Sequence, residues 1–154
     1  MSQYWLMKSE PNTYSIDDLA RDGSTCWEGV RNYQARNLMK QMCVGDLVLF
    51  YHSNANPPGV AGIAKVVREP YPDNYSWNKR SKYYDEKSTK DNPRWFMVDV
   101  GFVDKLKELV PLDVLKTAKG LEDMVVNKRS RLSVQPVKKP EFDIVKRLGS
   151  GRKT

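Results

Sequence analysis

The stretch Cys26-Trp27-Glu28-Gly29-Val30-Arg31-Asn32-Tyr33-Gln34-Ala35-Arg36-Asn37 places a large aromatic ring and a glycine directly before a helix-forming run. Apolar side chains recur at helical spacing up to Met42, so a helix is predicted over residues 33–42, with Asn32 as its N-cap. A helix N-terminus carries unpaired N–H groups and the positive end of the helix dipole, which suits polar or anionic ligands. Trp27 has two readings: it stacks on a planar ligand whose edge meets Arg31 and Asn32, or it is a core residue.

On either side of this stretch, apolar alternation bounded by turn residues predicts five strands. They cover residues 3–8, 47–52, 60–68, 95–103 and 131–137. Gly62, with an alanine on either side, indicates that the third of these strands packs closely against a bulky neighbour. Residues 69–92 lack a period and carry Trp77, Tyr83 and Tyr84, so we expect a long surface excursion with functional aromatic residues.

Short helices are predicted between these strands. Ser15 and Asp18 form a capping-box pattern that opens one, and the dipeptide at residues 22–23 stops it. Others are predicted at residues 111–118, 121–126 and 140–148. Because the strands do not alternate with full crossover helices, a doubly wound parallel sheet is disfavoured. The expected fold is α+β: a small, partly closed mixed β-barrel with short flanking helices, forming one domain over residues 1–149. Residues 150–154 are predicted to be a disordered basic tail.

The net charge of +7 is concentrated at the C-terminus. Residues 1–126 carry 17 basic and 17 acidic side chains, whereas residues 127–154 carry 9 basic and 2 acidic ones. A basic segment on a neutral body is typical of polyanion binding, although a merely soluble tail has the same composition. If the segment binds nucleic acid, the expected phosphate contacts are Lys128, Arg129, Lys138 and Lys139.

Composition and the N-terminal sequence also bear on the compartment. No apolar run reaches the length of a membrane span, and the N-terminus lacks the pattern of a signal peptide. We therefore expect no membrane partner and an intracellular, cytoplasmic chain, or a nuclear one in a eukaryote. Cys26 and Cys43 lack metal-ligand spacing, which favours free thiols.

Catalytic motifs are sparse. His52 is the only histidine, and neither a nucleophile motif, a phosphate-binding loop nor a set of metal ligands accompanies it. We expect no catalytic residue, metal or cofactor, and His52 is more readily structural than a general base. The carboxylates Glu10, Glu28 and Asp46 have two interpretations. Either two of them form a carboxylate pair, or each is an ordinary turn cap or surface charge. Aromatic rings interleaved with arginine and lysine, by contrast, match what holds an unstacked nucleobase.

Four sequence blocks lie in order along the chain: YWLMKSEP at residues 4–11, WEGVRNYQARN at 27–37, GDLVLFYHS at 45–53 and SRLSVQPV at 130–137. Taken together, these blocks resemble the EVE domain of the PUA-like superfamily. The resemblance implies a PUA-like barrel with flanking helices. It also implies kinship with YTH domains, which read methylated adenine in RNA through an aromatic cage, and a role as a reader of modified bases, including modified cytosine in DNA.

The resemblance also implies a base-binding pocket. Trp27 would form a wall that stacks on the base, and Lys8 and Ser9 would present the end of the first strand. The other pocket residues that the resemblance implies are Gly29, Arg31, Asn32, His52, Ser53, Asn54, Tyr84, Trp95, Arg131 and Ser133. Whether Tyr83, Tyr84 or Trp95 faces the pocket is left open by the sequence.

The function expected from these features is a non-enzymatic, monomeric module that binds a modified base, in cytosine or adenine, within DNA or RNA. Two alternatives stay open. One is a small hydrolase of a modified nucleoside, as in ASCH-type relatives, with Lys8, Glu10, Glu28 or His52 supplying acid or base. The other is a pocket for a small free metabolite.

Overall fold

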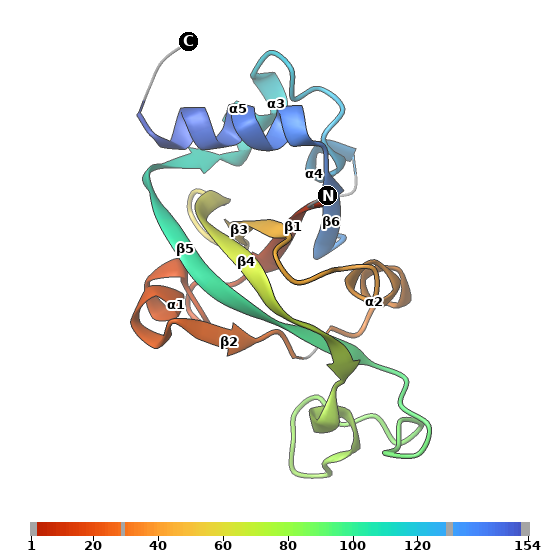
Figure 1. Ribbon diagram of the computed structural model, residues 1–154. Coiled ribbons are helices and arrows are strands. Elements are labelled where there is room, and N and C mark those ends of the chain that lie inside the picture. Colours follow the sequence, from red (N-terminus) through yellow and green to blue (C-terminus); the bar gives the residue numbers. More distant parts are fainter. Residues whose placement is uncertain (1–2, 29, 129–130, 152–154) are drawn as a thin grey trace.

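A mixed six-stranded sheet forms the centre of the molecule in the computed structural model, which describes residues 3–28, 30–128 and 131–151 (Figure 1). The strands lie in the order β2 (Ser24–Cys26), β5 (Phe96–Pro111), β4 (Gly59–Pro72), β3 (Leu47–His52), β1 (Tyr4–Ser9) and β6 (Val134–Val137). The pair β1–β3 is parallel and the other pairs are antiparallel. Within the described residues the sheet ends at β2 and β6, so it is an open sheet and not a closed barrel. The α+β class is confirmed.

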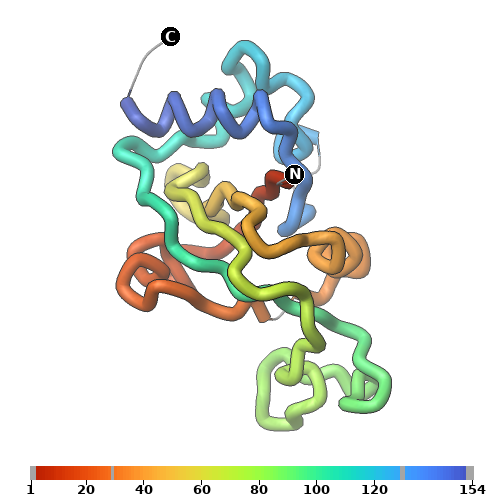
Figure 2. The backbone as a smooth tube through the Cα atoms, viewed as in Figure 1, coloured from red at the N-terminus to blue at the C-terminus, as the bar shows by residue number. Residues whose placement is uncertain are grey.

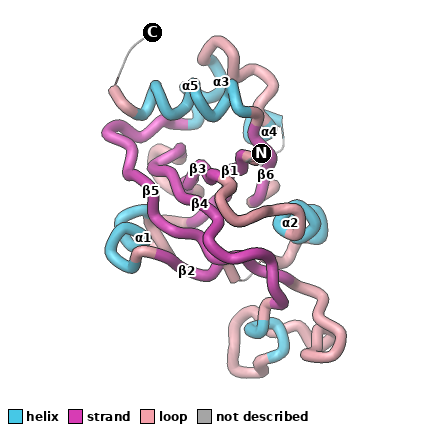
Figure 3. The backbone as a smooth tube through the Cα atoms, viewed as in Figure 1, coloured by secondary structure: helices cyan, strands magenta, loops and turns pink. Residues whose placement is uncertain are grey.

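Short helices cover the sheet at two ends (Figure 3). At one end lie α3 (Leu112–Thr117) and α5 (Lys139–Gly149), and at the other lie α1 (Ile16–Asp22) and α2 (Tyr33–Met39). A one-turn helix, α4 (Val125–Lys128), precedes β6, and a 3₁₀ helix, η1 (Asn74–Trp77), follows β4.

The core divides between the two faces of the sheet. Trp5 and Met7 of β1 pack with Phe50 in one cluster, whereas Leu6 packs with Phe142 of α5 in the other. Side chains of a strand alternate between faces, so β1 is buried on both. The first strand therefore contributes side chains to both clusters of the core.

The helix caps follow the sequence. Asp18 N donates to Ser15 Oγ at 3.1 Å and Ser15 N donates to Asp18 Oδ2 at 2.8 Å, which completes the predicted capping box of α1. Gly23 ends the helix with φ 83°, a conformation that glycine adopts without strain. Asn32 Oδ1 accepts from Ala35 N at 2.9 Å and caps α2, which ends three residues earlier than predicted.

Close packing at Gly62 is also confirmed. A Cβ atom at this position would overlap the side chain of Ile16 in α1 and lie 2.8 Å from Asp104 O. The glycine therefore lets α1 lie directly on β4.

The long hairpin of β4 and β5 differs from the prediction. Both strands run beyond their predicted ends, and residues 69–72, assigned to the excursion, belong to β4. The C-terminal part of β5 carries exposed charged side chains such as Lys105 and Lys107, whereas Leu106 and Val110 are buried. This part of β5 was not predicted because the charged side chains interrupt the apolar alternation. The strand β2 was not predicted because it is too short to show a period. The excursion projects from the tip of the hairpin (Figure 2).

Candidate functional site

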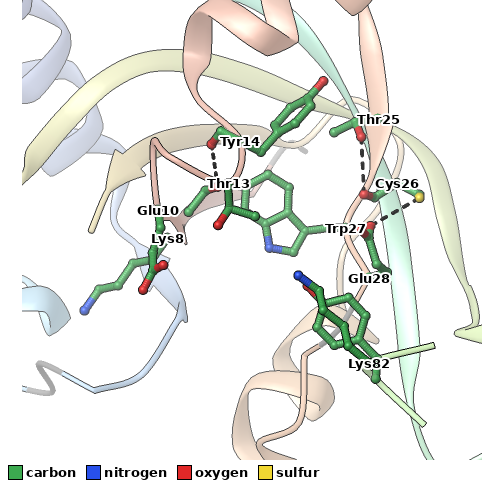
Figure 4. Close-up of a pocket in the computed structure, with 11 residues that line it drawn as sticks. Lys8, Glu10, Thr13, Tyr14, Thr25, Cys26, Trp27, Glu28 and Lys82 are labelled. Carbon is green, nitrogen blue, oxygen red and sulfur yellow. Dashed lines mark hydrogen bonds between the residues drawn. The ribbon is translucent and has the colours of Figure 1, made fainter. Parts of the chain in front are cut away.

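A cavity of about 380 Å³ opens where the end of β1 meets β2 and the excursion (Figure 4). Its lining combines aromatic rings, two carboxylates, two ammonium groups and hydroxyls. The lining residues are Lys8, Ser9, Glu10, Thr13, Tyr14, Thr25, Cys26, Trp27, Glu28, Lys82 and Tyr83. Its size falls within the ~300–1,000 Å³ typical of pockets for small ligands.

Trp27 forms the inner wall of this cavity. Its side chain is 9% exposed and meets the Phe50 ring edge to face, with centroids 5.5 Å apart. Its backbone N donates to Val98 O at 2.8 Å, which extends the β2–β5 pairing by one residue. Figure 4 shows the indole lying between Thr13 and Lys82. The indole therefore belongs to the core and also lines the cavity.

The rim near β1 is held by short hydrogen bonds. Ser9 Oγ donates to Tyr14 O at 2.6 Å, and Tyr14 Oη donates to Asp22 Oδ2 at 2.9 Å. Burial, with the neighbouring Asp22, raises the pKa of Tyr14 to about 12, so the phenol stays protonated at neutral pH. Burial lowers the pKa of Lys8, whose Nζ lies 5.4 Å from the centroid of the Tyr51 ring.

Two carboxylates border the cavity. The Cys26 thiol donates to Glu28 Oε2 at 3.3 Å, and burial together with Glu28 raises the pKa of Cys26 to about 11. The sulfur is therefore a thiol at neutral pH and a poor nucleophile. Glu10 is exposed, and its Oε1 accepts from Asn54 Nδ2 at 3.4 Å. Such carboxylates can accept from the exocyclic amine of a base such as cytosine.

His52 has a structural contact. Its Nε2 accepts from Ile16 N at 3.1 Å, at the first turn of α1, and burial is the main cause of its lowered pKa. Asp46 is also structural: it is 1% exposed and accepts from Trp5 Nε1 at 3.0 Å and Cys43 N at 2.9 Å. It therefore belongs to a turn, and only Glu10 and Glu28 of the three carboxylates line the cavity.

Arg31 fastens the excursion to the body. It donates to Tyr83 O through Nε at 3.2 Å and through Nη2 at 2.6 Å. Its Nη1 forms an ion pair of 3.1 Å with Asp73, whose side chain is fully buried. The guanidinium thus holds both ends of a loop segment, so its role in the geometry is to shape the site.

Beyond Tyr83 lies a second, more open cavity of about 540 Å³. It is lined by Arg31, Lys82, Tyr83, Tyr84, Asp85, Glu86 and Trp95. The structure thus places Tyr83 at both cavities and Tyr84 and Trp95 at the second one. These contacts give the orientation that the sequence left open.

The other predicted pocket residues that the structure describes do not line the first cavity; they are Asn32, His52, Ser53, Asn54, Arg131 and Ser133. Ser53 N donates to Ser9 O at 3.0 Å, and Lys8 N donates to Ser133 O at 2.9 Å. Asn32 is the cap of α2 and Arg131 is exposed. Gly29 and Arg129 lie outside the described residues.

The predicted phosphate-binding lysines lie elsewhere. Val137 pairs with Tyr4, at the opposite end of β1 from Lys8, so Lys138 and Lys139 follow β6 at the end away from the cavity. Lys139 pairs with Asp143 at 2.9 Å, and Lys128 pairs with Asp123 at 3.3 Å. All four residues in these pairs are exposed, so the pairs contribute little to stability.

Several lining residues were not predicted. Thr13, Tyr14 and Thr25 lie on turns or on the short strand β2, and Lys82 lies in the excursion. Of these four, only Lys82 lies in a stretch that the sequence marked as functional, the excursion with its aromatic residues.

Two features are absent from the described ranges of the chain. No group of three or more His, Cys, Asp or Glu side chains there could hold a metal ion. No helix in the same part of the chain is long and apolar enough to cross a membrane.

The sheet, its flanking helices and the cavity beside Trp27 define a small α+β domain. Residues 3–148 match the EVE domain model, and the chain belongs to this family. The resemblance seen in the four sequence blocks is thereby confirmed.

Individual relatives extend this comparison. Human thymocyte nuclear protein 1 is 45% identical over 164 residues, which cover 94% of this chain and 73% of that protein. A hypothetical protein from Leishmania major is 48% identical, with a TM-score of 0.94 over 98% of this chain and 96% of that one. The crystal structure of human THYN1 protein in complex with 5-methylcytosine-containing DNA has 44% identity and a TM-score of 0.92, over 99% of this chain and 100% of that one.

A third structure, of the ZmASCH mutant protein from Zymomonas mobilis, is similar at a TM-score of 0.53 and 12% identity, over 93% of this chain and 96% of that one. At this identity the similarity concerns the fold alone.

Proposed function

We propose that this chain is a non-enzymatic DNA-binding module that captures a modified cytosine in the cavity beside Trp27. The observation that carries the proposal is the cavity itself, in which an indole wall lies next to both carboxylate and ammonium groups. It is supported by the similarity to human THYN1 protein, which has been crystallised in complex with 5-methylcytosine-containing DNA.

The chemistry of the lining suits an extruded base. Proteins that bind a flipped base read its Watson–Crick edge by hydrogen bonds and stack apolar rings on its faces. Cytosine presents an amine donor beside acceptor atoms. In this proposal Glu10 accepts from the amine, Lys8 donates to an acceptor, and Trp27 stacks on the ring. A 5-methyl group would add apolar contact with the aromatic wall.

Further features that the sequence predicts are included in the proposal. These are the aromatic pocket, a PUA-like barrel left open between β2 and β6, a monomeric state, and an intracellular location that is cytoplasmic or, in a eukaryote, nuclear. Binding of RNA and binding of modified adenine are both measured in the titration described below. The phosphates beside the captured base would meet Lys8 and Lys82, and those farther along the strand would meet Lys128, Arg129, Lys138 and Lys139.

Hydrolysis of a modified nucleoside is the alternative from another class. Its motivation is that Lys8, Glu10 and Glu28 line one cavity. His52 already accepts a backbone hydrogen bond, and the Cys26 thiol is protonated at neutral pH. These two groups are therefore poorly placed to act as base and nucleophile.

The test is a binding titration against matched oligonucleotides that differ only in one base: cytosine, 5-methylcytosine, adenine or a methylated adenine. Each is measured as DNA and RNA, single- and double-stranded, at two salt concentrations. Selective binding of DNA with 5-methylcytosine is expected. Equal affinity for all bases would contradict the proposal, and turnover of a modified nucleoside would favour the hydrolase.

Three variants locate the site. Trp27→Leu keeps an apolar but smaller side chain and removes the stacking surface, and we expect a loss of about 1–3 kcal/mol of binding free energy. Glu10→Gln should reduce the preference for cytosine, since a neutral amide oxygen is a weaker hydrogen-bond acceptor than a carboxylate. Glu69→Gln, at an exposed glutamate on β4 outside the cavity lining, is the matched control and should bind like the wild type.

A further inference from the structure

The second cavity adjoins the first one through two shared residues. Lys82 and Tyr83 line both, so a chain that places one planar group beside Trp27 passes Tyr83 to reach the second space. A cavity at this position is where the neighbour of a captured nucleotide would lie.

The aromatic rings that line the second cavity differ in their existing contacts and in their exposure to solvent. Trp95 is 5% exposed and stacks on Tyr33, with centroids 4.8 Å apart and planes at 24°. The ring centroid of Tyr83 lies 5.6 Å from the Arg31 guanidinium carbon. Tyr84 is 40% exposed. The ring of Tyr84 is therefore the one with surface to offer to a further planar group.

The floor beneath Tyr84 is held firmly. Arg31 donates two hydrogen bonds to Tyr83 O, and Trp95 Nε1 donates to Asp85 Oδ2 at 2.7 Å. Buried hydroxyls of Ser76 and Ser88 meet at 2.9 Å inside the same loop. A binding surface that is ordered beforehand costs less entropy on binding.

The charges of the second cavity favour a neutral ring over a phosphate. Asp85 and Glu86 balance the two cations that line it, Arg31 and Lys82. The hydrogen bond from the indole N–H of Trp95 is the main cause of the lowered pKa of Asp85, and Arg94, 4.0 Å away, lowers it further. A base, which has a π face and polar edges but no net charge, fits this lining better than an anion.

We infer that the second cavity is a binding subsite for the base that flanks the captured one, with Tyr84 as its stacking surface. Lys82, at the boundary of the two cavities, contacts the phosphate between the two nucleotides. This inference rests on the proposed function, and it assigns the excursion the task of reading one neighbour of the modified base.

The experiment uses short single-stranded DNA with one 5-methylcytosine, in which each flanking nucleotide is replaced in turn by an abasic site. On one flank the abasic site should weaken binding about 5- to 100-fold, the range of base–aromatic stacking. Tyr84→Ala should weaken binding of the intact DNA equally, and that abasic site should then have no further effect. Tyr75→Ala, an exposed tyrosine of the same excursion outside this lining, is the matched control.

A second measurement separates the inference from the proposal on which it rests. Binding of 5-methyl-2′-deoxycytidine 5′-monophosphate should be unchanged in Tyr84→Ala, because this ligand has no flanking base. If modified DNA binds selectively but neither abasic flank nor Tyr84→Ala alters affinity, the subsite is wrong and the proposed function stands. If the wild type does not discriminate modified DNA at all, the proposed function fails, and the subsite fails with it.

Discussion

At the scale of single residues, the cavity lies beside side chains whose polar atoms are already committed to the fold. His52 shows this most clearly, because its Nε2 accepts the backbone N–H of Ile16 at the start of α1. A ring nitrogen that accepts a hydrogen bond is unprotonated, so this contact requires neutral His52. Burial favours the same form.

Acidification should therefore destabilise the protein through His52. Because its pKa is lower in the folded state than its ordinary 6.5, the unfolded chain binds the proton more readily. Stability is fully present above pH 6.5 and is lost as the pH falls through the window below that value. Urea unfolding at pH 7.5 and pH 5.5 should show a lower free energy of unfolding at the acidic pH.

The variant His52→Gln serves as the comparison, since its amide can accept a hydrogen bond but does not titrate. The difference in unfolding free energy between the two pH values should shrink in this variant. An equal difference in both proteins would show that other groups cause the pH dependence.

At the scale of elements, the excursion is a loop held by one buried charge pair. Asp73 is fully buried and Arg31 is its cationic partner, one-quarter exposed. Removal of one partner from a buried pair leaves an uncompensated charge and costs ~3–5 kcal/mol. Arg31 should therefore control whether the excursion keeps its shape.

The variant Arg31→Met should lose about 3 kcal/mol of stability, the lower end of that range because Arg31 is partly exposed. Trypsin should also cut the excursion faster under native conditions, at lysines such as Lys82 and Lys87. Arg21→Met is the control: its arginine pairs at the surface with Asp18 and Asp22, and the expected cost is below about 1 kcal/mol. Equal proteolysis of both variants would contradict the role of Arg31.

Elements differ in how far the sequence predicts them. The caps at Ser15 and Asn32 were predictable because a helix start is set by a few neighbouring residues. The packing of the excursion was not, because the partners Arg31 and Tyr83 are 52 residues apart. The same reason explains the site: Trp27 was singled out from its own neighbours, whereas Thr13 and Lys82 reach it only through the tertiary fold.

At the scale of the whole molecule, the cavity is separated from two lysines of the basic C-terminal segment. Lys138 and Lys139 follow β6 at the end of β1 that is farther from Lys8. If both regions contact one DNA molecule, the C-terminal lysines meet phosphates away from the captured base. Their contribution should depend on DNA length.

The double variant Lys138→Ala/Lys139→Ala should reduce the slope of log K against log salt by about 2 on a long duplex, at ~0.9 for each phosphate contact. On a trinucleotide the slope should be unchanged. Lys116→Ala/Lys119→Ala, which removes two exposed lysines outside the basic segment, is the matched control. Equal slopes for both double variants on the long duplex would show that the C-terminal lysines do not contact phosphate.

Photo-crosslinking tests directly whether the modified base enters the cavity beside Trp27. DNA with 5-iodocytosine at the target position carries a photoreactive atom where the methyl group would be. After irradiation and trypsin digestion, the account predicts adducts on the peptide of residues 22–31, which contains Trp27. Adducts confined to peptides beyond residue 127 would contradict the account, since they would place the base at the basic segment and not in the cavity.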